Sequence, residues 1–92
     1  MDYKVVYTKN SQKDLERLDA SVVRRILKKI DEYSRRKNPF EFAKKLTGFV
    51  LDTYRFRVGD YRVIFRLDPK TEQLVILVIL RIQHRKEIYR KL

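Results

Sequence analysis

The sequence predicts an α+β domain with the element order β-α-α-β-β-β, in which a twisted antiparallel sheet of about four strands carries a two-helix hairpin on one face. Three patterns support this prediction. Apolar residues with helical spacing mark residues 22–33, apolar and cationic residues alternate around Gly59-Asp60, and a nearly continuous aliphatic run fills residues 74–81. Because 92 residues can bury one modest core, we expect a single domain over residues 1–92.

The N-terminal part should form a strand followed by a short helix. Residues 3–8 are β-prone and alternate as a strand does. A side-chain oxygen of Thr8, Asn10 or Ser11 can then cap a helix that continues to Leu18, because these residue types accept hydrogen bonds from the amides of the first helical turn.

A second, longer helix should begin after Asp19, another suitable N-cap. It should end at Asn38-Pro39, because the residue before a proline avoids the helical region. Its buried side is an apolar stripe with helical spacing, made of Val22, Val23, Ile26, Leu27, Ile30 and Tyr33. Almost nothing separates the two helices, so we expect a helical hairpin whose apolar side packs on the sheet.

The C-terminal half contains the remaining strands. Residues 40–48 should connect helix to sheet, with room for a short helical turn, and strands follow at about residues 51–58 and 61–67. A turn then leads to a central strand at residues 74–81, whose aliphatic character fits burial on both faces. Residues 84–92 form a short terminal segment that can be helical.

The hairpin around Gly59-Asp60 is the most informative feature. A two-residue turn with glycine first fixes a register in which Arg57 lies opposite Arg62. One side of this hairpin carries Arg55, Arg57, Arg62 and Arg66, and the reverse side carries Tyr54, Phe56, Val63, Phe65 and Leu67. Like charges directly opposite one another destabilise a sheet, so this cationic side should hold an anion. Arginine suits phosphate, because its planar fork donates two parallel hydrogen bonds and stays charged.

The same arginines also fit a simpler interpretation, the solvated side of a half-covered sheet, where charged residues keep edges from aggregating. Solvation alone does not require four cations of one sign without an interleaved acid. We therefore favour a functional surface.

The composition indicates a polyanionic or acidic partner. The chain has 23 Lys and Arg against 12 Asp and Glu, a net charge of +11 that is spread over both halves. It has no cysteine and one histidine, so disulfides and cysteine nucleophiles are excluded and a zinc site is not expected. The N-terminus lacks a signal-peptide pattern, and we expect a cytoplasmic protein, without a membrane segment, that uses no metal or other cofactor.

Two residues near the C-terminus carry side chains that suit RNA chemistry. His84 is the only histidine, the residue type best suited to proton transfer near neutral pH, and it follows the central strand, where a general acid can lie; an ordinary surface histidine would look the same in the sequence. Tyr89 can stack on a base or bind a phosphate, or it can pack the terminus onto the sheet.

Four short segments follow one another in the second half of the chain, and with the β-α-α-β-β-β order they form a pattern over essentially its whole length: Lys45-Leu46-Thr47-Gly48, Tyr54-Arg55-Phe56-Arg57, Gly59-Asp60-Tyr61-Arg62-Val63-Ile64-Phe65 and His84-Arg85-Lys86-Glu87-Ile88-Tyr89. Together they resemble toxins of the RelE/ParE superfamily of type II toxin–antitoxin systems. RelE-like members are ribosome-dependent endoribonucleases that cut mRNA, and ParE-like members inhibit DNA gyrase. The resemblance implies a RelE-like mRNA interferase. The alternatives are a ParE-like gyrase inhibitor, a catalytically inactive binding protein and a plain nucleic-acid-binding module.

The resemblance also implies site residues and partners. The catalytic candidates are Arg55, Arg57, Arg62, His84, Arg85 and Tyr89, and the further RNA-binding candidates are Arg66, Arg81 and Lys86. The implied reaction is a metal-free transesterification in which the RNA 2′-hydroxyl attacks the adjacent phosphate. The implied partners are mRNA, the ribosome and an acidic RelB-like antitoxin.

The chain departs from the family pattern at two points. RelE proteins have lysines at the second-strand basic positions, here Arg55 and Arg57, and arginine is a poor base because its pKa exceeds about 12. Gln83 stands where a catalytic arginine is expected. The general base therefore stays unassigned, and the general acid is open among Arg81, His84 and Arg85.

Overall fold

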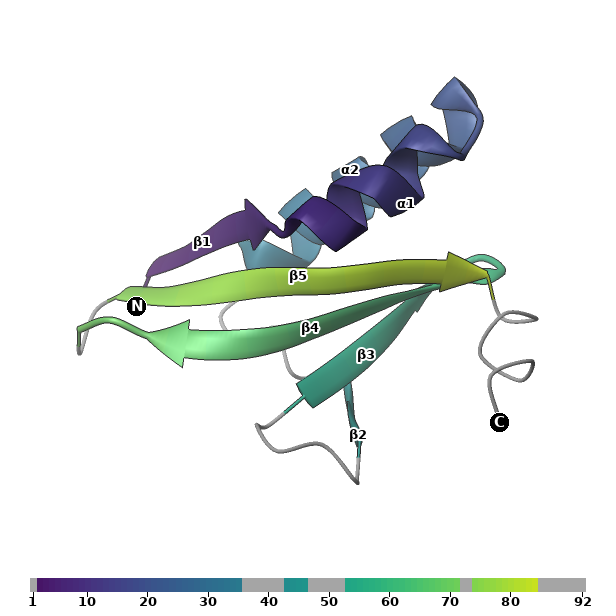
Figure 1. Cartoon of the computed structure of the whole chain (residues 1–92). Helices are drawn as coiled ribbons and strands as arrows, with labels where there is room; N and C mark the ends of the chain where they lie inside the picture. The colour runs from purple at the N-terminus through teal and green to yellow at the C-terminus, as the bar shows by residue number, and fades with distance from the viewer. Residues whose placement is uncertain (1, 36–42, 47–52, 72–73, 85–92) are drawn as a thin grey trace.

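The computed structural model describes residues 2–35, 43–46, 53–71 and 74–84, and it has the predicted α+β fold (Figure 1). The elements are β1 (Asp2–Tyr7), α1 (Lys9–Glu16), α2 (Ala20–Ser34), β2 (Lys44–Leu46), β3 (Thr53–Val58), β4 (Tyr61–Pro69) and β5 (Leu74–His84). Both helices lie on one side of a single sheet (Figure 1). No helix of the described residues has the length and apolar character needed to cross a membrane.

The sheet differs in two respects from the expected one of about four antiparallel strands. It has five described strands in the order β1-β5-β4-β3-β2, because Lys44–Leu46 forms a short edge strand within the expected connection. In addition, β1 pairs with β5 in parallel, whereas the other pairs are antiparallel. Both helices and three strands lie between β1 and β5 in the chain, which gives the long connection that a parallel pair requires.

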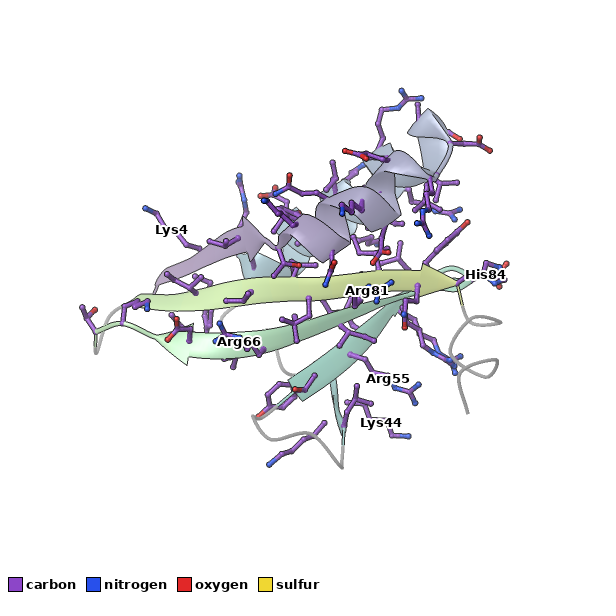
Figure 2. All side chains as sticks on the ribbon, viewed as in Figure 1. Lys4, Lys44, Arg55, Arg66, Arg81 and His84 are labelled. Atoms are coloured by element: carbon purple, nitrogen blue, oxygen red, sulfur yellow. The ribbon has the colours of Figure 1, made fainter. Side chains whose placement is uncertain are left out.

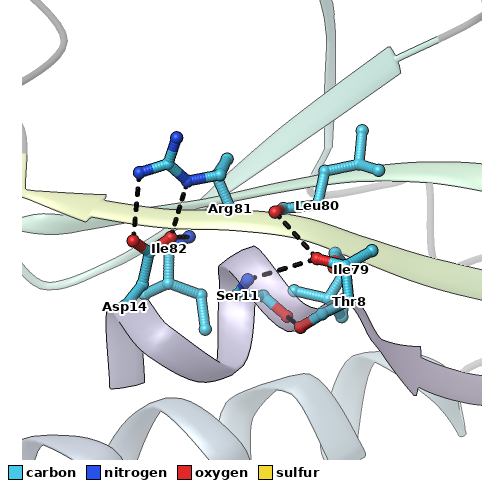
Figure 3. Close-up of polar contacts among 7 residues, drawn as sticks. All are labelled: Thr8, Ser11, Asp14, Ile79, Leu80, Arg81 and Ile82. Carbon is cyan, nitrogen blue, oxygen red and sulfur yellow. Dashed lines mark hydrogen bonds and ion pairs between the residues drawn. The ribbon is translucent and has the colours of Figure 1, made fainter. Parts of the chain in front are cut away.

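Thr8 joins β1 to α1 and to the central strand. Of the three candidate N-caps, Thr8 is the one used: its hydroxyl oxygen accepts a hydrogen bond from the Ser11 amide at 3.2 Å, and the hydroxyl donates to the Ile79 carbonyl at 2.9 Å (Figure 3). Its own amide also donates to the Ile79 carbonyl, at 3.1 Å. One residue therefore starts the helix and fixes its first turn beside β5.

The second helix begins after Asp19, as predicted, although the Asp19 side chain makes no capping hydrogen bond. It ends at Ser34, and the predicted stop at Asn38-Pro39 lies outside the described residues. Within its apolar stripe Ile26 and Ile30 are fully buried, whereas Leu27 is 36% exposed and lies at the margin of the packed side.

The core lies between the helices and the sheet. Ile26 and Ile30 of α2 belong to one buried cluster with Phe56 of β3 and Phe65 of β4. The aliphatic run of β5 supplies Leu77, Ile79 and Ile82 to the same cluster. This packing leaves the other face of the sheet without a helix from the described part of the chain (Figure 1).

Candidate functional site

The arginines predicted for one side of the β3–β4 hairpin do lie together. The structure pairs Arg57 with Arg62, Arg55 with Ile64 and Thr53 with Arg66, which is the register predicted from the sequence. Their side is opposite to the buried ring of Phe56, so it is the helix-free face. We call Arg55, Arg57, Arg62 and Arg66 the arginine surface.

The turn that fixes this register is the predicted two-residue turn. Gly59 has φ of +59°, a conformation that side-chain-bearing residues rarely adopt. A Cβ atom at this position would also lie 3.0 Å from the Arg25 guanidinium of α2. Glycine therefore sets the pairing of the two strands that carry the arginines.

A further cation, which sequence reasoning missed, belongs to the same face. Lys44 of β2 is the direct partner of Arg55 (Figure 2). A second row of like charges, Lys44 opposite Arg55, thus extends the Arg57–Arg62 row toward the edge of the sheet. A three-residue strand is too short to show a period-two pattern, so no local signal in the sequence indicates this neighbour.

The four arginines differ in exposure. Arg57 is exposed, Arg55 and Arg66 are half-buried, and Arg62 is only 4% exposed. Arg62 is therefore not part of a solvated face. A buried guanidinium loses hydration, and a charged ligand that reaches it interacts through a medium of low dielectric constant.

The negative charge near these cations is unevenly distributed. Asp68 lies two residues beyond Arg66 in β4, and it receives a 2.8 Å ion pair from Lys70. That hydrogen bond, with smaller contributions from the charges of Lys70 and Arg66, lowers the pKa of the Asp68 carboxyl. By contrast, Lys44, Arg55 and Arg57 make no ion pair with any acid in the described ranges. The positive potential should therefore be stronger around Lys44, Arg55 and Arg57 than around Arg66.

His84 does not join the arginine surface. It is the cross-strand partner of Tyr61, with ring centroids 5.2 Å apart in an edge-to-face arrangement, whereas Gln83 is the partner of Arg62. Because neighbouring residues in a strand point to opposite faces, Gln83 lies beside Arg62 and His84 points to the opposite face. The β5 residue paired with the buried Arg62 is thus Gln83, which has an uncharged amide side chain.

Arg81 is held by a carboxylate of α1. Its Nε donates to Asp14 Oδ2 at 2.8 Å and its Nη2 to Oδ1 at 3.0 Å, while the Ile82 amide donates to Oδ2 at 2.9 Å (Figure 3). The pairing of β1 with β5 ends at Ile79, and beyond this point the Asp14 carboxylate accepts the hydrogen bond of the Ile82 amide at the edge of β5. This bidentate pair uses much of the hydrogen-bonding capacity of Arg81 in a structural contact.

The remaining predicted site residues, Arg85, Lys86 and Tyr89, lie outside the described residues. Their roles stay predictions.

A pocket lies at the β2–β3 edge of the arginine surface. It has a volume of about 380 Å³ and is lined by Tyr33, Lys44, Arg55, Phe56 and Arg57. Tyr33 contacts Phe56 edge-on, with ring centroids 4.5 Å apart. The pocket thus combines cations of the helix-free face with aromatic rings from the core side.

Residues 5–89 match the family of the ParE toxin of the type II toxin–antitoxin system parDE. The chain is 32% identical to Toxin RelG of Mycobacterium tuberculosis over 92 residues, which cover 99% of this chain and all of that protein. Two solved structures are similar in fold. The RelBE2 toxin–antitoxin complex of M. tuberculosis has a TM-score of 0.76 at 28% identity, covering 92% of this chain and 100% of the matched one. The archaeal RelE–RelB complex of Pyrococcus horikoshii OT3 has a TM-score of 0.66 at 32% identity, covering 92% and 97%.

Proposed function

This chain belongs to the ParE toxin family of type II toxin–antitoxin systems, within the RelE/ParE superfamily, and we propose that it is a ribosome-dependent endoribonuclease that cleaves mRNA. The observation that carries this proposal is the double row of like charges, Lys44 opposite Arg55 and Arg57 opposite Arg62. Such rows oppose folding when empty and are compensated when a polyanion binds. The similarity to RelE-type toxins supports RNA as that polyanion.

The proposed reaction is attack of an RNA 2′-hydroxyl on the adjacent phosphorus, with cleavage of the bond to the 5′-oxygen. The products are a 2′,3′-cyclic phosphate and a 5′-hydroxyl. Negative charge grows on the non-bridging oxygens in the transition state, and Arg55, Arg57 and Arg62 would stabilise it. Because the arginines supply this charge, the proposed reaction uses no metal or cofactor.

The dependence on the ribosome follows from what surrounds Arg62. Its two direct cross-strand neighbours are Arg57 and Gln83, and neither side chain exchanges protons near neutral pH. His84 points to the other face, and Asp68 is engaged by Lys70. In this proposal the described residues contribute charge and orientation, while the ribosome supplies the geometry of the reacting 2′-hydroxyl. Arg85 and Tyr89 stay candidates for leaving-group protonation and base stacking.

A second function is favoured by a specific observation. The family that matches residues 5–89 is named for ParE, and no described residue beside Arg62 can serve as a general base. A gyrase inhibitor needs only a cationic binding surface. It would therefore use the same arginines without chemistry.

We further propose an acidic RelB-like antitoxin as the partner in a cytoplasmic complex. The similar structures from M. tuberculosis and P. horikoshii are both toxin–antitoxin complexes. With a net charge of +11, this chain should attract an acidic partner by long-range steering, at a rate that falls as salt is added.

Primer extension on a translated mRNA tests the proposal, with and without ribosomes, beside a gyrase supercoiling assay. Ribosome-dependent cuts support the nuclease. Inhibition of supercoiling without any cut would transfer the assignment to the gyrase inhibitor.

A further inference from the structure

The pocket at the β2–β3 edge exists because β2 is short. Lys44, the first residue of β2, pairs with Arg55, so among the described residues Phe56 and Arg57 have no strand on their outer side. Side chains from both faces of the sheet therefore reach one space. Tyr33 and Phe56 enter it from the core side, and Lys44, Arg55 and Arg57 enter from the helix-free face.

The lining selects for an anion. Lys44 and Arg57 are exposed, Arg55 is half-buried, and none of the three is paired with an acid in the part of the chain that the structure describes. Each charge is thus available to a ligand. Two guanidinium groups and one ammonium group around a single space are suited to phosphate oxygens.

The aromatic residues of the pocket favour a ligand that carries a base as well as a phosphate. Tyr33 is half-buried and lines the pocket next to the buried Phe56 ring. Aromatic rings beside cations are the usual combination for single-stranded nucleic acid, because the rings contact bases and the cations contact the backbone. A volume of about 380 Å³ is within the range of sites for small ligands and is enough for one nucleotide.

The pocket is also continuous with the Arg57–Arg62 row, since Arg57 belongs to both. Arg55 and Arg57 are two residues apart in β3, a separation of about 7 Å along a strand. This separation is comparable to that of successive phosphates in a single strand. A strand whose scissile phosphate lies among Arg55, Arg57 and Arg62 would therefore place its neighbouring nucleotide in the pocket, toward Lys44 and Tyr33.

We propose that the pocket lined by Tyr33, Lys44, Arg55 and Arg57 is a nucleotide subsite, which binds the RNA nucleotide next to the cleaved phosphate. This inference rests on the proposed function, because it takes RNA as the substrate. Lys44 binds the phosphate of that nucleotide and Tyr33 contacts its base. A carboxylate-rich protein segment fits the three cations but makes less use of the aromatic wall, so it is the less favoured occupant.

The test is binding of a fluorescein-labelled single-stranded RNA hexamer to the full chain, measured by fluorescence anisotropy over a series of salt concentrations. The variants are Lys44→Gln and Tyr33→Leu, where leucine keeps an apolar contact with Phe56. Lys4→Gln is the matched control, since it removes an equal charge from the exposed Lys4 on β1, the opposite edge strand. Thermal unfolding checks that each variant is folded.

Lys44→Gln should reduce the magnitude of the slope of log K against log salt by about 0.7, the value for one phosphate contact on a single strand, and Lys4→Gln should leave the slope unchanged. Tyr33→Leu should weaken binding about 5- to 150-fold without changing the slope, as loss of one aromatic–base contact does. Equal slopes for Lys44→Gln and Lys4→Gln would overturn the subsite. So would a Lys44→Gln variant that loses affinity for a poly-glutamate peptide but not for RNA.

Primer extension with the wild-type chain separates this inference from the proposed function. Ribosome-dependent cleavage combined with unchanged RNA binding by both pocket variants would remove the subsite alone. Pocket-dependent RNA binding without any mRNA cleavage would keep the binding site and remove the nuclease proposal.

Discussion

Arg57 of β3 and Arg62 of β4 are direct cross-strand partners on the helix-free face of the sheet, and Arg62 is 4% exposed. Two cations in this position repel each other, and the buried one has lost hydration. A mixed or neutral pair would make a more stable hairpin. We interpret the pair as a preformed anion site that lowers the stability of the free domain.

Arg57→Gln tests whether the facing arginines lower the stability of the domain while they support its activity. Removing one of the two facing charges should raise the free energy of unfolding by about 0.2–1 kcal/mol. The same change should lower mRNA cleavage about 10²- to 10³-fold, as loss of one oxyanion contact does. Arg24→Gln, at an exposed position of α2, is the control for general charge loss. Similar cleavage by both variants would reduce the arginine surface to a generic basic patch.

The Asp14–Arg81 contact should be a main source of stability. Asp14 is 9% exposed and accepts three hydrogen bonds, so Asp14→Ala removes the acceptor of two Arg81 hydrogen bonds and of the Ile82 amide. Because these three hydrogen bonds are lost at a largely buried carboxylate, we expect the free energy of unfolding to fall by about 3 kcal/mol in urea titrations. Glu32→Gln, which removes the exposed pair with Lys29, should cost less than about 1 kcal/mol. Equal losses in the two variants would contradict this account of the β5 edge.

The backbone of the hairpin turn should tolerate no side chain at Gly59. Its φ of +59° makes Gly59→Ala unfavourable by about 1–2 kcal/mol. The nearby Arg25 guanidinium is the end of a flexible side chain and can move aside. The double variant Gly59→Ala/Arg25→Ala should therefore be less stable than the single Arg25→Ala variant by the same amount, about 1–2 kcal/mol. If the double variant were as stable as Arg25→Ala alone, contact with the Arg25 side chain, and not the backbone conformation, would be the reason for glycine.

Tyr7 should make the domain less stable at alkaline pH. Burial, and then the charge of Asp31, raise the pKa of its phenol above 10.0. The folded state therefore holds this proton more tightly than the unfolded state, so the stabilising effect is complete below pH 10 and is lost as the pH rises through the folded pKa. Urea titrations between pH 9 and about 11.5 should show a smaller fall in stability for Tyr7→Phe than for the wild type. Parallel curves would exclude this contribution, since the lysines titrate alike in both proteins.

The sequence predicted the features that depend on local patterns. The apolar stripe of α2 and the turn at Gly59 each depend on a few neighbouring residues, and the hairpin register followed from that turn. The N-cap of α1 was narrowed to three neighbouring candidates, of which the structure uses Thr8. The alternation in β3 and β4 then predicted which arginines share a face.

Features that depend on distant contacts were not predictable in the same way. Lys44 reaches the arginine surface only through a three-residue strand, and Arg81 meets Asp14 across 67 positions of the chain. The chemistry of His84 suits a general acid, but the β4–β5 register places Gln83 beside Arg62. That register includes an irregularity near Ile64 and Phe65, so simple alternation along β5 does not predict on which face of the sheet each side chain lies.

The central claim is that the arginine surface acts on mRNA in the ribosome. The most direct measurement is primer extension on one mRNA incubated with the purified chain, in the presence and absence of translating ribosomes, with Arg57→Gln as the matched variant. We predict discrete cuts that require ribosomes, carry 5′-hydroxyl ends and decrease about 10²-fold or more in the variant. Uncut mRNA in the presence of ribosomes, or equal cutting of free RNA, would contradict the claim.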